Sequence, residues 1–316
     1  MSSASIYSSE TAIVSGKLSV DTARRLLNRE KLAAYAVLCR PRIAVMTAVS
    51  VMVGFVLASN STIDWFQAVM ASLGIVLFVA ASSILNQTLE RGTDALMPRT
   101  SSRPLVTGIV GVAEALCLGT AAAILGFLTL TFSTNMLCAI ASLLTMLIYV
   151  VGYTPLKRHS VVCTTVGAIP GAMPAALGWL ATGNPDYSPA FALFAIFFVW
   201  QFPHFLAIGW IYRHEYSSAG LRMLPGSSKT GMTAGIIALL YAAIFVPVAL
   251  LPRNVGIAST GYSAAALILS VGYFILTLQF AIRRDDIRAR RLMFGSLICL
   301  PMLLLVMVAD FIRMTS

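Results

Sequence analysis

The chain contains 316 residues, of which 58% are hydrophobic and 11% charged, and it carries a formal net charge of +10. An ordinary globular domain is about 25% charged. With a mean hydropathy of +0.86, this chain has too few polar groups to cover a soluble surface. Composition therefore excludes a soluble or disordered protein and indicates a polytopic membrane protein. The basic residues lie between apolar runs rather than on one polar domain, so we expect no nucleic-acid partner.

The chain begins with a Ser-rich segment that lacks the long apolar core of a cleavable secretory signal. Within it, residues 21–40 are predicted to form a basic amphipathic helix on the cytoplasmic membrane surface. We therefore expect residues 1–40 to be a cytoplasmic segment, partly disordered or amphipathic. A single transmembrane domain is expected to follow over residues 41–316.

The rest of the chain is a succession of long apolar runs. A helix rises about 1.5 Å per residue and the hydrocarbon core is about 30 Å thick, so each span needs about 20 apolar residues. The predicted fold class is an all-α transmembrane bundle of about nine spans. Their expected ranges are 43–60, 65–86, 111–131, 134–152, 162–182, 189–211, 231–251, 260–281 and 292–312.

Positive charge is distributed unevenly between the two sides of this predicted bundle. Every Lys and Arg except Arg253 and Arg313 lies in the N-terminal segment or in a loop after an even-numbered span. Cytoplasmic loops carry the excess of positive charge in membrane proteins. The pattern predicts a cytoplasmic N-terminus and a C-terminus outside, which requires an odd number of spans.

The densest group of polar residues follows span 2. Asn86, Glu90 and Asp94 are spaced four apart, so on a continuing helix they share one face. Two carboxylates and an amide oxygen on one face suit Mg²⁺ carrying a phosphate, and Arg99 and Arg103 follow with guanidinium groups that grip phosphate oxygens. The alternative is a solvated loop with local ion pairs such as Glu90 with Arg91.

Two more polar groups are predicted on the same side. The first follows span 4 and consists of Tyr153, Lys157 and Arg158. These residues are either a phenol and two cations that bind phosphate, or an anchor that fixes the topology at the membrane interface. Pro155 favours a turn here over a helix.

In span 6, Trp200, Gln201 and His204 are either ligands of a substrate in the bundle or hydrogen-bonded packing residues. At its cytoplasmic end, Glu215 is either a further metal ligand or a surface acid. Acids and cations that converge at the mouth of an apolar bundle fit a ligand with a diphosphate head and a long apolar tail.

These residues resemble the UbiA superfamily of intramembrane prenyltransferases. Asn86, Glu90 and Asp94 match its Asn-Asp-x-x-Asp-x-x-x-Asp motif, with Gln87 in place of the first Asp, and Tyr153 with Lys157 matches its Tyr-x-x-x-Lys element. Longer runs resemble the branch that farnesylates protohaem IX: 97–105, 153–158, 200–206 and 212–225. The chain departs from the pattern at Glu215, where relatives have Asp, and at Ala219, where no second acid follows.

The resemblance implies transfer of a farnesyl group from farnesyl diphosphate to a vinyl group of haem b, with addition of water to give haem O. One or two Mg²⁺ ions are expected on Glu90, Asp94 and Glu215. The expected catalytic residues are Asn86, Glu90, Asp94, Tyr153 and Lys157. Diphosphate binding is expected from Arg99, Arg103, Lys157, Arg158 and Arg213, and haem binding from Trp200, Gln201, His204 and His214.

The resemblance also implies a location in the bacterial inner (cytoplasmic) membrane, in contact with lipid, with the active site on the cytoplasmic side. Haem A synthase or the assembly pathway of a haem-copper oxidase is the class of partner that it implies. Two alternatives stay open. One is a sister prenyltransferase for an aromatic or quinone-precursor acceptor, and the other is a transporter or channel.

Overall fold

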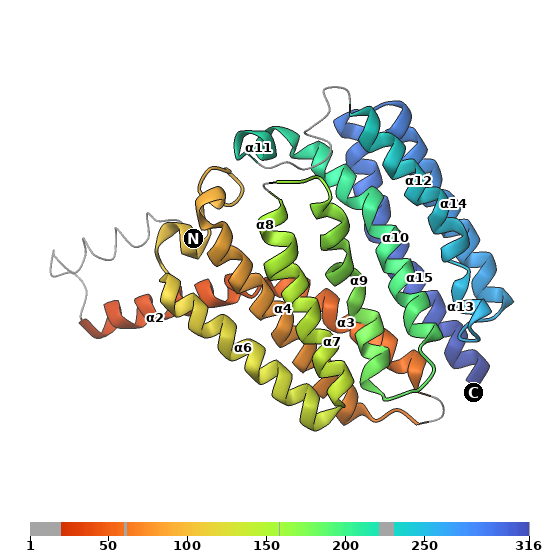
Figure 1. Ribbon diagram of the computed structural model, residues 1–316, viewed down its shortest axis with the longest axis horizontal. Coiled ribbons are helices and arrows are strands. Elements are labelled where there is room, and N and C mark those ends of the chain that lie inside the picture. The colour runs from red at the N-terminus through yellow and green to blue at the C-terminus, as the bar shows by residue number, and fades with distance from the viewer. Residues whose placement is uncertain (1–19, 60–61, 158, 221–230, 316) are drawn as a thin grey trace.

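The structure is a computed structural model that describes residues 20–59, 62–157, 159–220 and 231–315 (Figure 1). Across these ranges the regular elements are helices, without a strand, as the sequence predicts. In chain order they are α2 (Val20–Leu38), α3 (Pro41–Ala58), α4 (Trp65–Asp94), α5 (Pro104–Thr107), α6 (Val112–Ser133), α7 (Met136–Leu147), the π-helix η1 (Ile148–Tyr153), α8 (Thr154–Leu156), α9 (Cys163–Ala181), α10 (Ser188–Ile211), α11 (Arg213–Ser218), α12 (Met232–Val248), α13 (Leu251–Asn254), α14 (Thr260–Ile282) and α15 (Asp286–Thr315).

Eight helical segments within the described residues are long and apolar enough to cross a membrane, and they correspond to eight of the nine predicted spans. The remaining predicted span, 162–182, forms helix α9 but falls outside this set. Pro170 and Pro174 lie inside α9 and reduce its apolar content. Because α9 packs against α3, α7 and α10, it does not need a fully lipid-compatible surface.

Two helix ends differ from the sequence prediction, and both differences affect the polar cluster. Helix α4 runs on to Asp94 instead of ending at residue 86. The turn expected at Pro155 is wrong, because α7 continues through η1 into α8. Pro155 lies in α8 directly after the π-helical turn, and proline's fixed φ is compatible with the helical conformation there.

The helices form two groups that meet at α9 and α10 (Figure 1). In the N-terminal group, α4 packs against α3 and α6, and α9 packs against α3 and α7; in the C-terminal group, α10, α12, α14 and α15 pack together. The contact between α3 and α9 is close because of glycine. A Cβ added to Gly54 would lie 1.8 Å from the Ala175 carbonyl oxygen, and one added to Gly178 would lie 2.0 Å from that of Val51.

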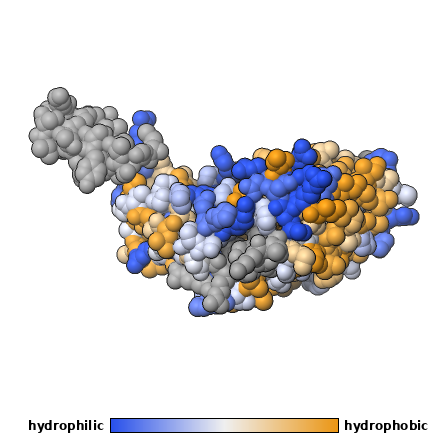
Figure 2. All heavy atoms as spheres, turned by 90° about the horizontal axis from the view of Figure 1, so that it is seen from above, coloured by the Kyte–Doolittle hydropathy of each residue, from blue (hydrophilic) through white to orange (hydrophobic). Residues whose placement is uncertain are grey.

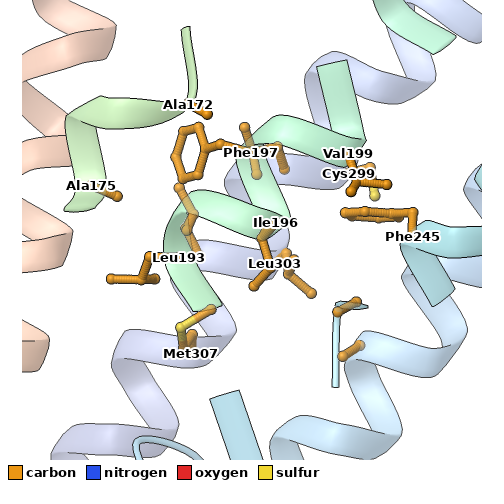
Figure 3. Packing of buried hydrophobic residues seen from close by; sticks show 14 of the residues in the cluster. Ala172, Ala175, Leu193, Ile196, Phe197, Val199, Phe245, Cys299, Leu303 and Met307 are labelled. Carbon is orange, nitrogen blue, oxygen red and sulfur yellow. The ribbon is translucent and has the colours of Figure 1, made fainter. Parts of the chain in front are cut away.

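The interface between the groups is a continuous apolar core. Figure 3 shows side chains of α10, Phe197 and Ile196 among them, between α9 on one side and α12 and α15 on the other, and Leu303 is one of the α15 side chains in this core. Hydrophilic residues gather instead on one face of the molecule, seen from above in Figure 2. The two groups thus form a fixed frame whose polar end carries the cluster predicted from the sequence.

Candidate active site

Helix α4 presents the three predicted polar residues in a row at its C-terminal end. Asn86 and Asp94 are 0% and 2% exposed, and Glu90 lies between them one turn from each. The Asn86 Nδ2 atom donates a hydrogen bond of 2.7 Å to Glu90 Oε2. The four-residue spacing places the amide and the first carboxylate on one face of α4, as the sequence predicts, and the structure adds a direct hydrogen bond between them.

Both carboxylates of this row pair with cations from other elements. Lys157 Nζ lies 2.8 Å from Glu90 Oε1, and both side chains are nearly buried. Arg103 donates to Asp94 Oδ2. The alternative of a solvated loop with a local Glu90–Arg91 pair is wrong, since Glu90 bonds to Asn86 and Lys157 and Arg91 is exposed.

The π-helix η1 places two tyrosines against this row. The Tyr149 and Tyr153 ring centroids are 5.2 Å apart, and Lys157 Nζ lies 4.3 Å from the centre of the Tyr153 ring. Thr154 Oγ1 donates to Asn86 Oδ1 at 2.9 Å, which ties the end of η1 to α4. Single π-helical turns inside longer helices occur frequently at functional sites.

The charge state of Lys157 follows from these contacts. Burial opposes the charged ammonium, but the Tyr153 phenol and the Glu90 carboxylate beside it more than offset this, so the pKa of Lys157 lies above its usual value. A raised pKa keeps the ammonium protonated at neutral pH. The site therefore holds a cation in contact with the Glu90 carboxylate.

These side chains line a polar chamber of about 400 Å³. Acidic, basic and phenolic groups share its wall, and the lining residues are Arg40, Ile43, Glu90, Thr93, Asp94, Met97, Arg99, Thr100, Arg103, Tyr149, Tyr153, Lys157 and Tyr216. Arg99 lies over the Tyr212 ring, 5.2 Å from its centroid. The polar chamber thus brings together three of the basic residues predicted to bind the diphosphate, which are Arg99, Arg103 and Lys157.

A second chamber of about 420 Å³ adjoins the polar one and is mostly apolar. Five residues line both chambers: Arg40, Ile43, Tyr149, Tyr153 and Tyr216. The apolar chamber is lined by residues of α3, α4, α7, α9 and α10, and it shares Val79, Thr145 and Pro174 with a small cavity of about 30 Å³. The two main chambers together form a polar head space that leads directly into an apolar tail space.

Glu90 and Asp94 are also candidate ligands of a divalent cation. No group of three or more His, Cys, Asp or Glu side chains that would hold a metal is found in the part of the chain that the structure describes. Mg²⁺, however, is usually bound through one or two carboxylates together with substrate phosphates. Glu90 and Asp94 on the wall of the polar chamber provide such a pair.

Glu215 does not join this pair. It lies on α11 and does not line the polar chamber, although its neighbour Tyr216 does. Its Oε2 atom is buried and has no hydrogen-bond partner among the described residues. A buried carboxylate oxygen without a partner is costly, so Glu215 retains the capacity to accept a ligand.

Among the described residues, Arg213 and His214 were predicted at the site but line neither chamber. Arg213 pairs with Asp286 at 2.8 Å, and His214 is exposed. Arg158 lies outside the described residues, as does residue 223, at which the Met-Leu-Pro end of the 212–225 run begins.

The cluster predicted in the interior of span 6 has bonded partners within the bundle. His204 Nδ1 lies 2.6 Å from Ser296 Oγ, and the His204 ring stacks on Trp200. Gln201 Nε2 donates to the Ala168 carbonyl at 2.7 Å, which ties α10 to α9. Of the two interpretations of this cluster, the contacts favour hydrogen-bonded packing.

Arg40 and Tyr216 line both chambers, although neither was predicted at the site from the sequence. Arg40 was interpreted only as a topological charge, and Tyr216 was not assigned a role. Arg40 precedes Pro41 at the junction of α2 and α3, and Tyr216 follows Glu215 on α11. Their proximity to α4 arises from tertiary packing, for which the local sequence gives no periodic signal.

Comparison with known proteins gives consistent matches over most of the chain. A family model described as the UbiA prenyltransferase family matches residues 47–298. A relative from Koribacter versatilis, named protoheme IX farnesyltransferase, is 40% identical over 247 residues, which are 76% of this chain and 80% of the relative. The structure of a digeranylgeranylglyceryl phosphate synthase covers 90% of this chain and 99% of its own, with a TM-score of 0.77 and 17% identity.

A UbiA homologue from Archaeoglobus fulgidus, solved with bound GPP and Mg²⁺, covers 88% of this chain and 99% of its own chain. Its TM-score is 0.63 and its sequence identity 20%. At these identities the two solved structures establish the fold alone.

Proposed function

This chain belongs to the UbiA prenyltransferase family of transferases, and we propose that it transfers a farnesyl group from farnesyl diphosphate to a vinyl group of haem b, yielding haem O. The relative from Koribacter versatilis, named for this activity on protohaem IX, supports the choice of acceptor. The joined polar and apolar chambers support the choice of donor. Together they favour one reaction, in which an amphiphilic diphosphate is cleaved inside the bundle.

The junction of the two chambers is the observation that carries the proposal. A prenyl diphosphate has an anionic head and a long apolar tail, and this cavity offers cations at one end and apolar walls at the other. The diphosphate lies in the polar chamber near Arg99, Arg103 and Lys157. The tail extends past Val79 toward the small cavity, where burial of apolar surface favours binding.

A magnesium ion is expected with the diphosphate, held by Glu90 and Asp94, and Glu215 is the further ligand if α11 approaches. Such an ion neutralises charge on the departing diphosphate when bound. The displacement of Lys157 and Arg103 from the two carboxylates would free both cations for phosphate oxygens. In this arrangement the two carboxylates bind the magnesium ion, and the two basic side chains bind the diphosphate.

The chain's own groups then act on the reaction in a definite order. As the C1–O bond of the donor breaks, its electron pair leaves with the diphosphate, and Arg99, Arg103 and Lys157 stabilise the growing charge. The walls of the apolar chamber exclude water, and the faces of Tyr149 and Tyr153 stabilise the allylic cation. The vinyl carbon bonds to C1, and water adds to the porphyrin-side cation with loss of a proton.

We place the reaction on the cytoplasmic side of the inner membrane. The support is the distribution of Lys and Arg, which lie almost entirely on the side that carries the polar chamber. A cytoplasmic N-terminus and a C-terminus outside require an odd number of spans. In this proposal α9 therefore crosses the membrane in addition to the eight long apolar segments. Haem A synthase or the assembly pathway of a haem-copper oxidase is the proposed consumer of the product.

The direct test is mass spectrometry of haems extracted after purified protein is incubated with haem b, farnesyl diphosphate and Mg²⁺. We expect a new haem heavier by a farnesyl group plus a hydroxyl, and its loss when Mg²⁺ is chelated. If haem b stays unchanged while an aromatic acceptor is prenylated, the chain is a sister prenyltransferase. Uptake of farnesyl diphosphate into vesicles without any product would contradict a transferase.

A further inference from the structure

The small cavity of about 30 Å³ beside the apolar chamber contains a hydroxyl group without a partner. Ser142, on α7, lines this cavity and is 1% exposed. Its Oγ atom is buried and has no hydrogen-bond partner among the described residues. Because an unpaired buried hydroxyl is costly, we expect Ser142 to bind a polar ligand inside the cavity.

The other two hydroxyl groups that line the cavity are paired. Ser82 Oγ donates to the carbonyl oxygen four positions earlier at 2.8 Å, and Thr145 Oγ1 does the same at 2.7 Å. Each of these oxygens keeps lone pairs that can accept a hydrogen bond. Cys138, one turn before Ser142, donates its thiol to the Leu177 carbonyl at 3.5 Å, and its sulfur is only a weak acceptor. The cavity therefore offers one unpaired hydroxyl and two oxygens that can still accept.

A backbone carbonyl of α9 in the cavity wall also lacks its usual donor. Pro170 and Pro174 lie inside α9, and both line the cavity. In an α-helix the Pro170 carbonyl accepts from the N–H of residue 174, and proline has no N–H. In membrane helices, Ser and Thr side chains or ordered water molecules bind carbonyls that proline has freed. The wall of the cavity thus combines an unpaired hydroxyl with a carbonyl that a water molecule can reach.

We propose that Ser142 binds a water molecule in the small cavity, and that this water is a polar stop for the farnesyl tail. A buried water needs about 10–15 Å³ of space and about two to four polar partners, and the cavity supplies both. The Ser142 hydroxyl donates to the water. The water donates to the Pro170 carbonyl and to a hydroxyl oxygen of Ser82 or Thr145. The water site is independent of the reaction, whereas its effect on the tail rests on the proposed function.

The water limits the tail space through hydrogen bonds rather than through bulk. Because the apolar chamber and the small cavity share lining residues, a tail that extends beyond the chamber enters the cavity and displaces the water. An apolar tail cannot replace the hydrogen bonds of that water. The Ser142 hydroxyl and the Pro170 carbonyl would then be buried without partners, which weakens binding about 10- to 100-fold. A cavity lined only by apolar groups would stay dry and accept the tail.

The test combines a crystal structure with kinetics, both on the full-length protein. The crystal structure of the wild type, at a resolution that shows ordered waters, is searched for a water within hydrogen-bond distance of Ser142 Oγ. The kinetics compare kcat/KM for geranylgeranyl diphosphate, which is one isoprene unit longer, with kcat/KM for farnesyl diphosphate, using haem b as the acceptor. Ser142→Ala removes the hydroxyl, and Ser142→Thr keeps it.

Thr131→Val is the matched control. The Thr131 Oγ1 atom is also buried and has no hydrogen-bond partner among the described residues. Thr131 lies on α6, however, and lines neither the two chambers nor the small cavity. This variant therefore deletes an unpaired buried hydroxyl without touching the proposed water site.

We expect the wild-type structure to contain a water bonded to Ser142 Oγ. In Ser142→Ala, the ratio of kcat/KM for geranylgeranyl to that for farnesyl diphosphate should rise about 10-fold, because the longer tail no longer leaves this hydroxyl unpaired. Ser142→Thr should not raise the ratio, and Thr131→Val should keep the wild-type value.

A wild-type structure in which Ser142 Oγ bonds to the protein and the cavity holds no water would overturn the inference. An unchanged ratio in Ser142→Ala would overturn it as well. An equal rise in Thr131→Val would do the same, since it would trace the change to a general loosening of the bundle. Failure of the proposed function is distinguishable, because then the wild type would form no prenylated haem from either donor, while the water would still be bound.

Discussion

The Lys157 ammonium lies 2.8 Å from the Glu90 carboxylate, which joins the end of α8 to α4 across 67 positions of sequence. Glu90 also accepts a hydrogen bond from Asn86, so one carboxylate connects a neutral amide and a cation. This contact places the charged groups of two elements in one chamber. It is the relationship from which the proposed binding of a metal-bound diphosphate follows.

Substitution of Lys157 by methionine should lower kcat by about 100-fold, as removal of one group that stabilises developing negative charge does. Lys157→Arg should retain more activity, since it keeps the charge. The measurement is steady-state kinetics with farnesyl diphosphate. Equal activity of Lys157→Met and wild type would remove Lys157 from the catalytic set. A double-mutant cycle with Glu90→Gln should be non-additive, because the two groups touch.

The apolar chamber should set the length of the prenyl chain. Val79 lines both the chamber and the small cavity beyond it, so Val79→Trp should obstruct the far end of the tail space. We expect kcat/KM for farnesyl diphosphate to fall about 10- to 200-fold, a range typical of misfit in an apolar pocket, and that for geranyl diphosphate to fall less.

Val69→Trp is the control for this obstruction. Val69 lies on the same helix, and half of its surface is exposed on the outside of the bundle. This variant should behave as wild type toward both donors. Equal losses for the two donors in Val79→Trp would show that the substitution perturbs something other than the end of the tail space.

The contact between His204 and Ser296 predicts a structural effect. Ser296→Ala removes one buried hydrogen-bond partner, which contributes about 1 kcal/mol, and it should lower the unfolding midpoint by about 2–4 °C. We expect kcat and the affinity for haem to stay unchanged. Weaker haem binding at an unchanged unfolding midpoint, in this variant or in His204→Phe, would instead assign the pair to haem.

The distribution of basic residues predicts the orientation of the termini. Alkaline phosphatase, which is active only outside the cytoplasm, should be active when fused after Ser316 and inactive when fused within the loop that carries Arg99 and Arg103. The enzyme activity of whole cells measures this directly. An inactive C-terminal fusion with an active loop fusion would reverse the orientation. Inactivity of both fusions would mean an even number of spans, with α9 not crossing the membrane.

Local periodicity accounts for what the sequence predicts correctly. The apolar runs delimit the helices, and the four-residue spacing of Asn86, Glu90 and Asp94 places them on one face because α4 continues to Asp94. The same spacing links Tyr153 to Lys157, although Pro155 suggested a turn. Regular spacing is sufficient to predict which side chains share a face when all of them lie on one continuous helix.

Tertiary contacts account for what the sequence does not predict. Arg213 was expected at the diphosphate, but its partner Asp286 is 73 positions away, and no local pattern indicates that pair. Arg40 reaches the chamber because hydrogen bonds from α4 fix the joint before Pro41. Gln87 replaces an acid of the family motif, and its role is visible only once its bond to Leu38 is known.

The most direct test of the account is mass spectrometry of haem formed in ¹⁸O-labelled water, comparing wild type with the double variant Glu90→Gln/Asp94→Asn. Glu114→Gln is the control, since Glu114 binds Lys31 and lines neither chamber. We predict a Mg²⁺-dependent haem that carries farnesyl and heavy oxygen from wild type and from the control, and none from the double variant, which should remain folded. A double variant that forms this product at the wild-type rate would contradict the account.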